Sequence, residues 1–258
     1  MSDAIRVGLV GFGYASKTFH APLIGGTPGM ALKAVASSDA DKVHADWPGV
    51  KVMSAPGDLL DDPDIDLVVI ATPNDTHFPL AKAALEAGKH VVVDKPFTVT
   101  LSQARELESL AKHCGRILSV FHNRRWDSDF LTVSALINEG QLGEVCYFES
   151  HFDRFRPQVR QRWREQAGPG SGIWYDLAPH LLDQVVVLFG LPVSITVDLA
   201  QLRPGAQSTD YFHAVLAYPQ RRVVLHGTFT AAGGAARHIA RRRGERALYR
   251  PRLAGQLY

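Results

Sequence analysis

The chain has 258 residues, 46% of them hydrophobic and 21% charged, which suits a globular protein with one large domain or two modest ones. This composition excludes collagen-like, disulfide-rich and strongly disordered classes. The net charge of +2 includes +6 from Arg237 to Tyr258, so the rest of the chain carries −4 and lacks the basic face of a nucleic-acid-binding protein.

The first part of the chain alternates between strand and helix patterns. Short apolar runs predict strands at 5–10, 32–36, 65–71, 90–93 and 117–121, and helical patterns start near residue 16 and cover 80–87 and 102–112. Strands that are apolar on nearly every residue are buried on both faces, as in parallel sheets covered by helices. We therefore predict an α/β fold with a doubly wound parallel Rossmann sheet over residues 1–122.

The pattern changes after Phe121. Helices are predicted at 129–139 and 174–189, and longer alternating strands at 145–152, 194–199, 212–218 and 222–228. Long strands with few intervening helices indicate a second, α+β domain over residues 123–258 with an open, mainly antiparallel sheet.

A glycine-rich turn links the first strand to the first helix. Gly11, Phe12, Gly13, Tyr14 and Ser16 belong to it. Gly11 suits the tight turn, Gly13 lets the backbone approach a pyrophosphate, and Ser16 stands where a third glycine is usual. Free N–H groups at the helix start complete an anion site. We predict that this turn binds a dinucleotide.

The end of the second strand bears on the choice of cofactor. Asp39 lies near the spacing expected for an acid on the adenosine ribose, which would favour NAD. Ser37, Ser38 and Lys42 could instead hold a 2′-phosphate and favour NADP. Alternatively, these residues could cap the next helix. The prediction leans to NADP, with NAD as the alternative.

Several separated motifs together resemble the Gfo/Idh/MocA oxidoreductase family. They are GFGYAS from Gly11, TPNDTH from Thr72, VDKP from Val93 and GSGIWYDLAPH from Gly170. Further stretches, HNRRWDSDF from His122, RWRE from Arg162 and YDLAPHLLDQ from Tyr175, are similar to its NADP-dependent scyllo-inositol dehydrogenase-like branch. The resemblance runs from about Ile5 to about Gly227.

The resemblance implies catalytic roles for three residues. Lys95 matches the lysine of the family's Glu-Lys-Pro motif beside the nicotinamide, with Asp94 in place of the usual glutamate. Asp176 and His180 match an Asp-x-x-x-His pair in which the histidine transfers the proton. The cofactor contacts implied are Thr72, Asn74 and His77 on the nicotinamide side, and Trp163, Arg164 and Asn123 from the second domain.

The chemistry agrees with these roles. A histidine titrates near neutral pH and can take the hydroxyl proton while hydride leaves for the nicotinamide. The i, i+4 spacing lets Asp176 orient His180, and Lys95 supplies positive charge for a developing alkoxide. A metal site at Asp176, His180 and Asp183 is not expected, because no cysteine or second histidine shares that helix face.

Other residues are expected to be structural. Trp126 and Trp174 are predicted to lie in the core, and His151, His213 and His226 lie on strand patterns without a functional role. The two cysteines, the short apolar runs and the absence of a signal-like N-terminus predict a cytoplasmic protein without membrane attachment.

The sequence thus predicts an NAD(P)-dependent oxidoreductase that interconverts a secondary alcohol and a ketone on a polyol or sugar, with scyllo-inositol as one candidate. The alternative is a non-catalytic NADP(H)-binding sensor or an inactive remnant. The resemblance also assigns a substrate-binding and dimerisation role to the second domain, so a homo-oligomer is expected.

The C-terminal stretch departs from the resemblance. Residues 237–258 are rich in arginine and show neither strand alternation nor an apolar helical stripe. We expect a truncated or frameshifted end, an incomplete second sheet with an unpaired edge, and a basic tail outside the fold.

Overall fold

The computed structural model describes residues 4–232, 238–242 and 248–249. The chain divides into two compact units, Met1–Phe121 and His122–Tyr258.

The N-terminal unit is built on a six-stranded sheet in the order β3-β2-β1-β4-β5-β6. Its strands are β1 (Ile5–Val10), β2 (Met30–Ala36), β3 (Lys51–Met53), β4 (Leu67–Ile70), β5 (His90–Asp94) and β6 (Leu118–Phe121). All five strand pairs are parallel, which confirms the predicted doubly wound sheet. The strand order reverses between β1 and β4, and ligands bind outside the carboxyl ends of strands at such a switch point.

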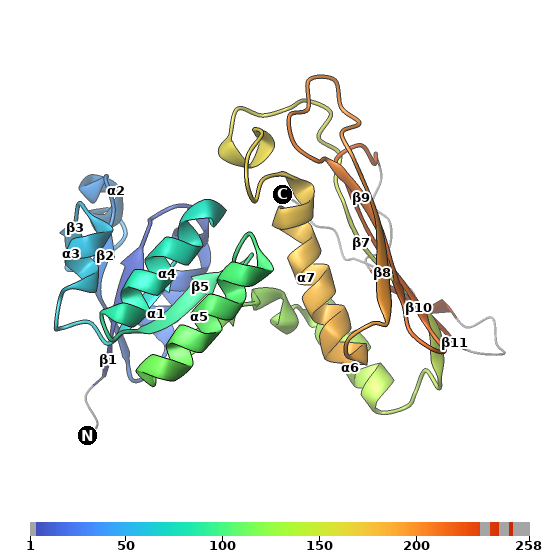
Figure 1. The fold of residues 1–258 in the computed structure, drawn as a ribbon, viewed down its shortest axis with the longest axis horizontal. Helices are drawn as coiled ribbons and strands as arrows, with labels where there is room; N and C mark the ends of the chain where they lie inside the picture. The colour runs from blue at the N-terminus through green and yellow to red at the C-terminus, as the bar shows by residue number, and fades with distance from the viewer. Residues whose placement is uncertain (1–3, 233–237, 243–247, 250–258) are drawn as a thin grey trace. The chain divides into compact units, whose positions relative to one another are not determined.

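Helices connect these strands. They are the π-helical turn η1 (Ser16–His20), α1 (Ala21–Gly26), α2 (Ala40–His44), α3 (Pro56–Leu60), the 3₁₀ turn η2 (Asn74–Thr76), α4 (His77–Glu86) and α5 (Leu101–Cys114). Figure 1 shows α4 and α5 side by side along the sheet, where Leu85 and Leu107 are fully buried in one core cluster. Ile24 of α1 belongs to a second cluster with Leu9 and Val35. Burial on both faces explains the uninterrupted apolar strands.

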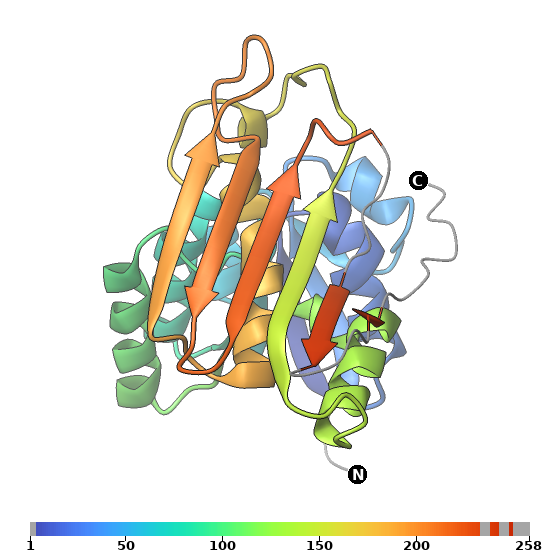
Figure 2. The same ribbon diagram turned by 90° about the vertical axis from the view of Figure 1, so that its right-hand side faces the viewer.

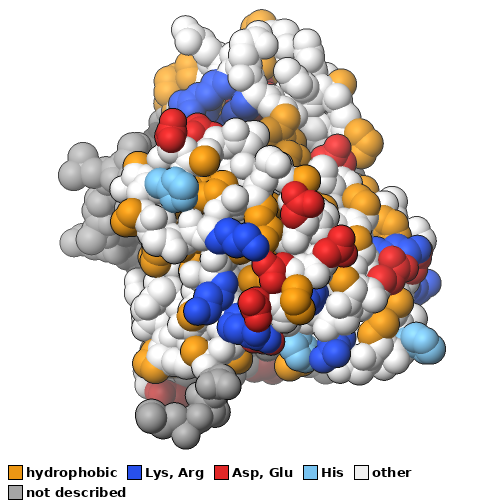
Figure 3. All heavy atoms as spheres, turned by 90° about the vertical axis from the view of Figure 1, so that its left-hand side faces the viewer, with side chains coloured by type: hydrophobic (Ala, Val, Ile, Leu, Met, Phe, Trp, Pro, Cys, Tyr) orange, Lys and Arg blue, Asp and Glu red, His pale blue; other side chains and the backbone are white. Residues whose placement is uncertain are grey.

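The surface of this unit carries paired charges. Arg6 contacts Asp64 and Asp66 at 2.8 and 2.7 Å, and Lys51 contacts Asp62 at 3.0 Å. Figure 3 shows the same mixture of acidic and basic side chains across one face. The Arg6 guanidinium and backbone N–H hold the pKa of the Asp66 carboxyl at about 2.

The C-terminal unit is built on a second six-stranded sheet, in the order β12-β11-β7-β10-β9-β8. Its elements are η3 (Asn123–Trp126), α6 (Ser128–Asn138), β7 (Val145–Asp153), η4 (Trp163–Glu165), α7 (Gly172–Phe189), β8 (Ser194–Ala200), β9 (Tyr211–Ala217), β10 (Arg222–Thr228), β11 (His238–Arg242) and β12 (Leu248–Tyr249). The β7–β10 pair is parallel and the other pairs are antiparallel, so the prediction of a mainly antiparallel sheet is confirmed.

Helix α7 covers one face of this sheet. Ile173, Leu177, Leu181 and Val185 follow the helical repeat and are at most 3% exposed. They pack in one core cluster with strand residues such as Phe212. Among the described residues no helix covers the opposite face of the sheet (Figure 2). None of the described helices has the length and apolar character needed to cross a membrane.

The C-terminal stretch differs from the expectation. His238–Arg242 forms β11, which pairs antiparallel with β7, and β12 pairs with β11. The prediction of no strand here is wrong, because β7 offers an open hydrogen-bonding edge and the strand needs only a short alternation. His238 and Ala240 supply it, at 1% and 5% exposure. The other residues of the predicted tail lie outside the described residues.

The two tryptophans expected in the core differ in their surroundings. Trp174 packs edge-on against Phe212, with ring centroids 5.4 Å apart. Trp126 is 77% exposed, so the core prediction is wrong for it. It ends the one-turn helix η3, which is too short to turn a continuous apolar face toward the sheet.

Leu181 tests the role of α7 in the core. Leu181→Ala removes a fully buried side chain and should lower the free energy of unfolding by about 2–5 kcal/mol, because a cavity remains. Urea unfolding followed by circular dichroism measures this change. Leu191→Ala, at a position 82% exposed, is the control and should stay within about 0.5 kcal/mol of wild type. Equal losses in the two variants would contradict this packing.

Candidate active site

The glycine turn after β1 has the shape expected of a phosphate cradle. Gly11 has φ of +88°, and a Cβ there would lie 2.9 Å from the Ala71 carbonyl oxygen. A Cβ on Gly13 would meet no described atom within 4 Å, so this side of the turn is open to a ligand. The buried Ser16 hydroxyl donates to the Gly11 carbonyl at 2.8 Å and closes the turn. These three residues fit a dinucleotide pyrophosphate.

The two aromatic residues of the turn differ in their exposure to solvent. Phe12 is 5% exposed and packs in the core cluster beside β1, whereas Tyr14 is 76% exposed. The Phe12 side chain is therefore a structural anchor, and only its backbone faces the turn.

The residues after β2 cap a helix. The Asp39 carboxylate accepts a hydrogen bond from the Lys42 backbone N–H at 3.0 Å and so caps α2. The Ser37 hydroxyl accepts from the Asp39 N–H at 3.2 Å. Ser38 and the Lys42 side chain are exposed. The capping alternative thus holds for Asp39, while Ser38 and Lys42 remain accessible to a ribose or phosphate.

The loop after β4 is fixed by a buried histidine. His77 is fully buried, and its ring nitrogens lie 2.8 Å from the Pro96 carbonyl oxygen and 3.0 Å from that of Thr72. The Thr72 and Thr76 hydroxyls share a 2.6 Å hydrogen bond, and Asn74 is 4% exposed. His77 therefore joins the loops after β4 and β5, and neither ring nitrogen faces outward.

The end of β5 carries the acid, and the loop after it carries the lysine. The Asp94 carboxylate accepts from the Lys95 backbone N–H at 2.7 Å. His20 from η1 lies with Nε2 at 3.6 Å from Asp94, and its ring packs 4.2 Å from the Phe121 ring. Burial raises the pKa of Asp94, but the neighbouring His20 and Lys95 outweigh it and hold the pKa below its usual value. Asp94 thus stays ionised beside Lys95.

Helix α7 presents the second predicted pair. Asp176 and His180 lie one turn apart, and His180 is 5% exposed. The His180 ring lies 6.3 Å from the Phe152 ring. The guanidinium groups of Arg124 and Arg154 lie 5.1 and 5.3 Å from the centroid of the Phe152 ring. The Phe152 ring is therefore in contact with two arginines and lies next to His180.

The predicted Trp-Arg pair joins this helix. The Arg164 guanidinium lies 4.3 Å from the Trp163 ring centroid, and its Nε lies 3.5 Å from an Asp176 carboxylate oxygen. Trp163 and Arg164 belong to η4, which contacts α7. The structure thus links the predicted cofactor contacts Trp163 and Arg164 to Asp176.

A buried ion cluster that the sequence did not indicate fixes this loop. Arg203 lies 3.0 Å from Glu165 and 2.9 Å from Asp210, and all three side chains are at most 3% exposed. Arg203 also donates to the backbone carbonyls of Arg156 and Gln158. No local sequence pattern reveals this cluster, because its members are 7 to 47 residues from Arg203.

The loop before η4 is rich in arginine. Burial lowers the pKa of Arg156 to about 10, and the charges of Arg154, Arg162 and Arg160 add to this shift. The Arg156 guanidinium packs 5.5 Å from the Phe229 ring. The positive charges of these arginines repel one another, so a negatively charged group bound close to this loop would be stabilised.

The η3 segment is held against α7. Gln184 donates to the Arg124 carbonyl at 2.8 Å, and Arg125 makes two hydrogen bonds to Asp183 at 2.8 and 2.6 Å. Asn123, in the same turn, is half-buried. Asp183 is therefore engaged by an arginine and does not join Asp176 and His180 in a ligand set.

The predicted site residues fall in two groups. The N-terminal unit carries the glycine turn, the capping residues after β2, Thr72, Asn74, His77, Asp94 and Lys95. The C-terminal unit carries Asn123, Trp163, Arg164, Asp176 and His180. Sequence reasoning missed His20, which contacts Asp94, and Arg203, which fixes the loop before Trp163 and Arg164.

Comparisons with known proteins decide the family. Residues 5–122 match the model of an oxidoreductase family's NAD-binding Rossmann fold, and residues 134–250 match its C-terminal α/β domain. The chain belongs to the Gfo/Idh/MocA oxidoreductase family. Its N-terminal unit is the NAD(P)-binding domain of that family, and the match extends beyond Gly227, where the resemblance was expected to end.

Curated relatives include two bacterial proteins. The chain is 79% identical over 239 residues to the uncharacterized oxidoreductase YdgJ of Escherichia coli K12, covering 93% of this chain and 69% of YdgJ. It is 38% identical to IolW of Bacillus subtilis, a scyllo-inositol 2-dehydrogenase (NADP(+)), covering 87% of this chain and 63% of IolW. The chain thus spans about two thirds of their length.

Solved structures share the fold. An oxidoreductase of Yersinia pestis, YPO2259, is 68% identical with a TM-score of 0.89, covering 94% of this chain and 69% of that one. An NAD-binding protein of Listeria innocua is 29% identical with a TM-score of 0.86, covering 93% and 71%. Both domains of this family therefore occur here in their known order.

The ion cluster around Arg203 yields a test. Arg203→Met leaves the buried Asp210 without its arginine and Glu165 with Arg162 alone, and should lower the free energy of unfolding by about 3–5 kcal/mol. Denaturant unfolding measures the loss. Arg160→Met is the control, since this exposed side chain lies on the same loop and its loss should cost less than about 0.5 kcal/mol. An Arg203→Met variant as stable as wild type would contradict the assigned role.

Proposed function

We propose that this protein is an NAD(P)-dependent oxidoreductase that interconverts a secondary alcohol and a ketone on a polyol or sugar. The observation that carries the proposal is the combination of the open glycine turn with Lys95 after β5 and the Asp176–His180 pair on α7. Family membership supports the reaction class, and the residues present supply its chemical requirements.

In the proposed reaction His180 accepts the hydroxyl proton of the alcohol, and in the reverse direction it returns that proton to the ketone oxygen. Asp176, one helical turn away, orients the imidazole. Lys95 stabilises the negative charge that develops on the reacting oxygen. A nicotinamide cofactor, when bound, would supply the hydride transfer.

The cofactor is proposed to lie along the N-terminal unit. The turn from Gly11 to Ser16 would hold the pyrophosphate, and Thr72 and Asn74 would lie toward the nicotinamide. Ser38 and Lys42 would face the 2′-phosphate of NADP, since Asp39 is engaged in capping α2. The relative IolW is a dehydrogenase that uses NADP(+), which supports NADP as the preferred cofactor.

The substrate is proposed to be a polyol or sugar with several hydroxyl groups, scyllo-inositol among them. The name of IolW, a scyllo-inositol 2-dehydrogenase, supports this class. Polar groups of the C-terminal unit suit such a substrate, because Asn123, Arg124 and Arg156 can donate hydrogen bonds to hydroxyl oxygens. We also propose a cytoplasmic homo-oligomer that uses the second sheet.

Two substitutions test the catalytic assignment. Lys95→Met and His180→Asn should each lower kcat for polyol oxidation by at least about 100-fold, because each removes charge or proton transfer in the transition state. Turnover is measured from nicotinamide absorbance, and cofactor affinity by fluorescence titration. Affinity should change little in either variant.

Lys82→Met and His113→Asn are the matched controls. Lys82 is paired with Glu106 on α4 and α5, and His113 is exposed on α5. Both controls should keep wild-type turnover. Near wild-type turnover in Lys95→Met or His180→Asn would contradict the mechanism. Cofactor binding without turnover of any polyol or sugar by the wild-type chain would favour the non-catalytic alternative.

A further inference from the structure

Three side chains that received no role in the sequence analysis meet on the uncovered face of the second sheet. Strands β7 and β10 pair in parallel, with His226 opposite His151 and Thr228 opposite Asp153. Phe152 faces His180 of α7, so its neighbours His151 and Asp153 point to the other face. Sheet register therefore fixes two histidines and one aspartate as neighbours.

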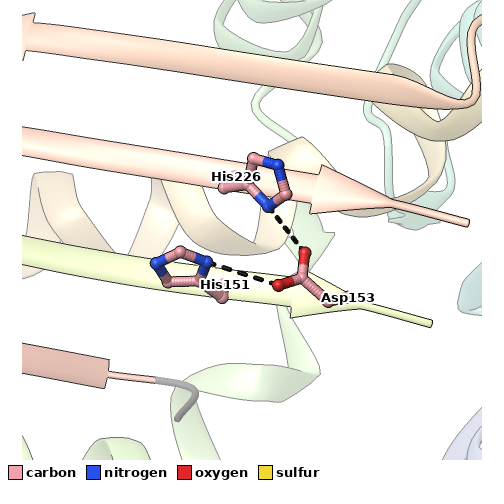
Figure 4. Close-up of side chains that lie close together, drawn as sticks. All are labelled: His151, Asp153 and His226. Carbon is pink, nitrogen blue, oxygen red and sulfur yellow. Dashed lines mark hydrogen bonds and ion pairs between the residues drawn. The ribbon is translucent and has the colours of Figure 1, made fainter. Parts of the chain in front are cut away.

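Their ligand atoms converge (Figure 4). His226 Nδ1 lies 2.6 Å from one Asp153 carboxylate oxygen, and His151 Nδ1 lies 3.4 Å from the other. One ligand atom from each residue lies within 4.8 Å of the other two. The side chains of His151, Asp153 and His226 are 18%, 7% and 19% exposed, so the group is mostly shielded but reachable.

Hydrogen bonds orient the His151 ring in the way that is typical of a metal-binding histidine. Its Nε2 lies 3.0 Å from a Glu149 carboxylate oxygen, and the Tyr147 hydroxyl donates to the other oxygen of Glu149. Its Nδ1 is buried and faces the Asp153 carboxylate at 3.4 Å. Metal-binding histidines usually donate their second ring N–H to a carboxylate, which fixes the tautomer and leaves the other nitrogen free to coordinate.

We propose that His151, Asp153 and His226 bind a zinc ion. Two imidazole nitrogens and a carboxylate oxygen are donors that Zn²⁺ accepts at about 2.0–2.2 Å in a tetrahedral arrangement, with a fourth position left for water. Donors around such an ion lie roughly 3.3 Å apart. His226 and His151 contact different oxygens of Asp153, at 2.6 and 3.4 Å, so one oxygen has to turn toward both histidines, and the ligand atoms already lie within 4.8 Å of one another.

The ion would join β7 to β10 at the parallel strand pair of this sheet. His213 on β9 is close, with its ring centroid 6.0 Å from that of His226, but it does not belong to the converging group. It therefore provides a matched control on the same face. The proposal does not depend on the proposed oxidoreductase reaction, because neither Lys95 nor the Asp176–His180 pair takes part.

The test is zinc binding by the purified chain after chelator treatment, measured by competition with a chromophoric chelator. We expect one ion per chain. His151→Ala and His226→Ala should weaken binding by at least about 100-fold, and Glu149→Gln, which removes outer support, by about 10–100-fold. His213→Ala should keep the affinity within about threefold of wild type, because it leaves every ligand in place.

Absorption spectroscopy at the zinc edge of the wild-type chain with one equivalent of zinc gives a second measurement that needs no variant. It should report two imidazole ligands. Failure to retain one ion per chain, fewer than two imidazoles, or a loss in His213→Ala as large as that in His226→Ala would each overturn the proposal. Unchanged circular dichroism of the variants shows that a loss reflects the site rather than the fold.

Discussion

The buried contacts of Arg203 position the candidate site residues of the C-terminal unit. Its guanidinium lies between Glu165 and Asp210 and also binds two backbone carbonyls of the arginine-rich loop. Buried charges are tolerated only when they are paired and hydrogen-bonded. The pairing of these buried charges therefore holds the loop that ends in Trp163 and Arg164 in one position. In that position Arg164 reaches Asp176 on α7.

In the N-terminal unit, buried polar contacts of histidines hold the loops in a similar way. His77 joins the loops after β4 and β5 through two backbone carbonyls, and His20 lies against Asp94 beside Lys95. Loops at the carboxyl edge of a parallel sheet have no regular ladder to hold them. Buried polar contacts supply that order and place Lys95 on a supported loop, as precise chemistry requires.

The local sequence predicted the main helices and strands and the glycine turn, because apolar periodicity and glycine geometry are local properties. It did not predict β3 or α3, which have three and five residues and too little periodicity. It failed for β11, whose pairing depends on the edge of β7. Motif resemblance located Lys95 and His180, but the partners His20 and Arg203 follow only from the tertiary fold.

Thermal unfolding with and without NADPH and NADH tests most directly whether the turn after β1 is a dinucleotide site. The account predicts one cooperative transition that NADPH raises more than NADH, with a stabilisation of about 2.7 kcal/mol at 100 times Kd. Gly13→Val should keep the melting temperature of the free chain, since the added Cβ meets no described atom within 4 Å, yet lose the shift. A transition that neither nucleotide moves, or a shift that survives in Gly13→Val, would contradict the account.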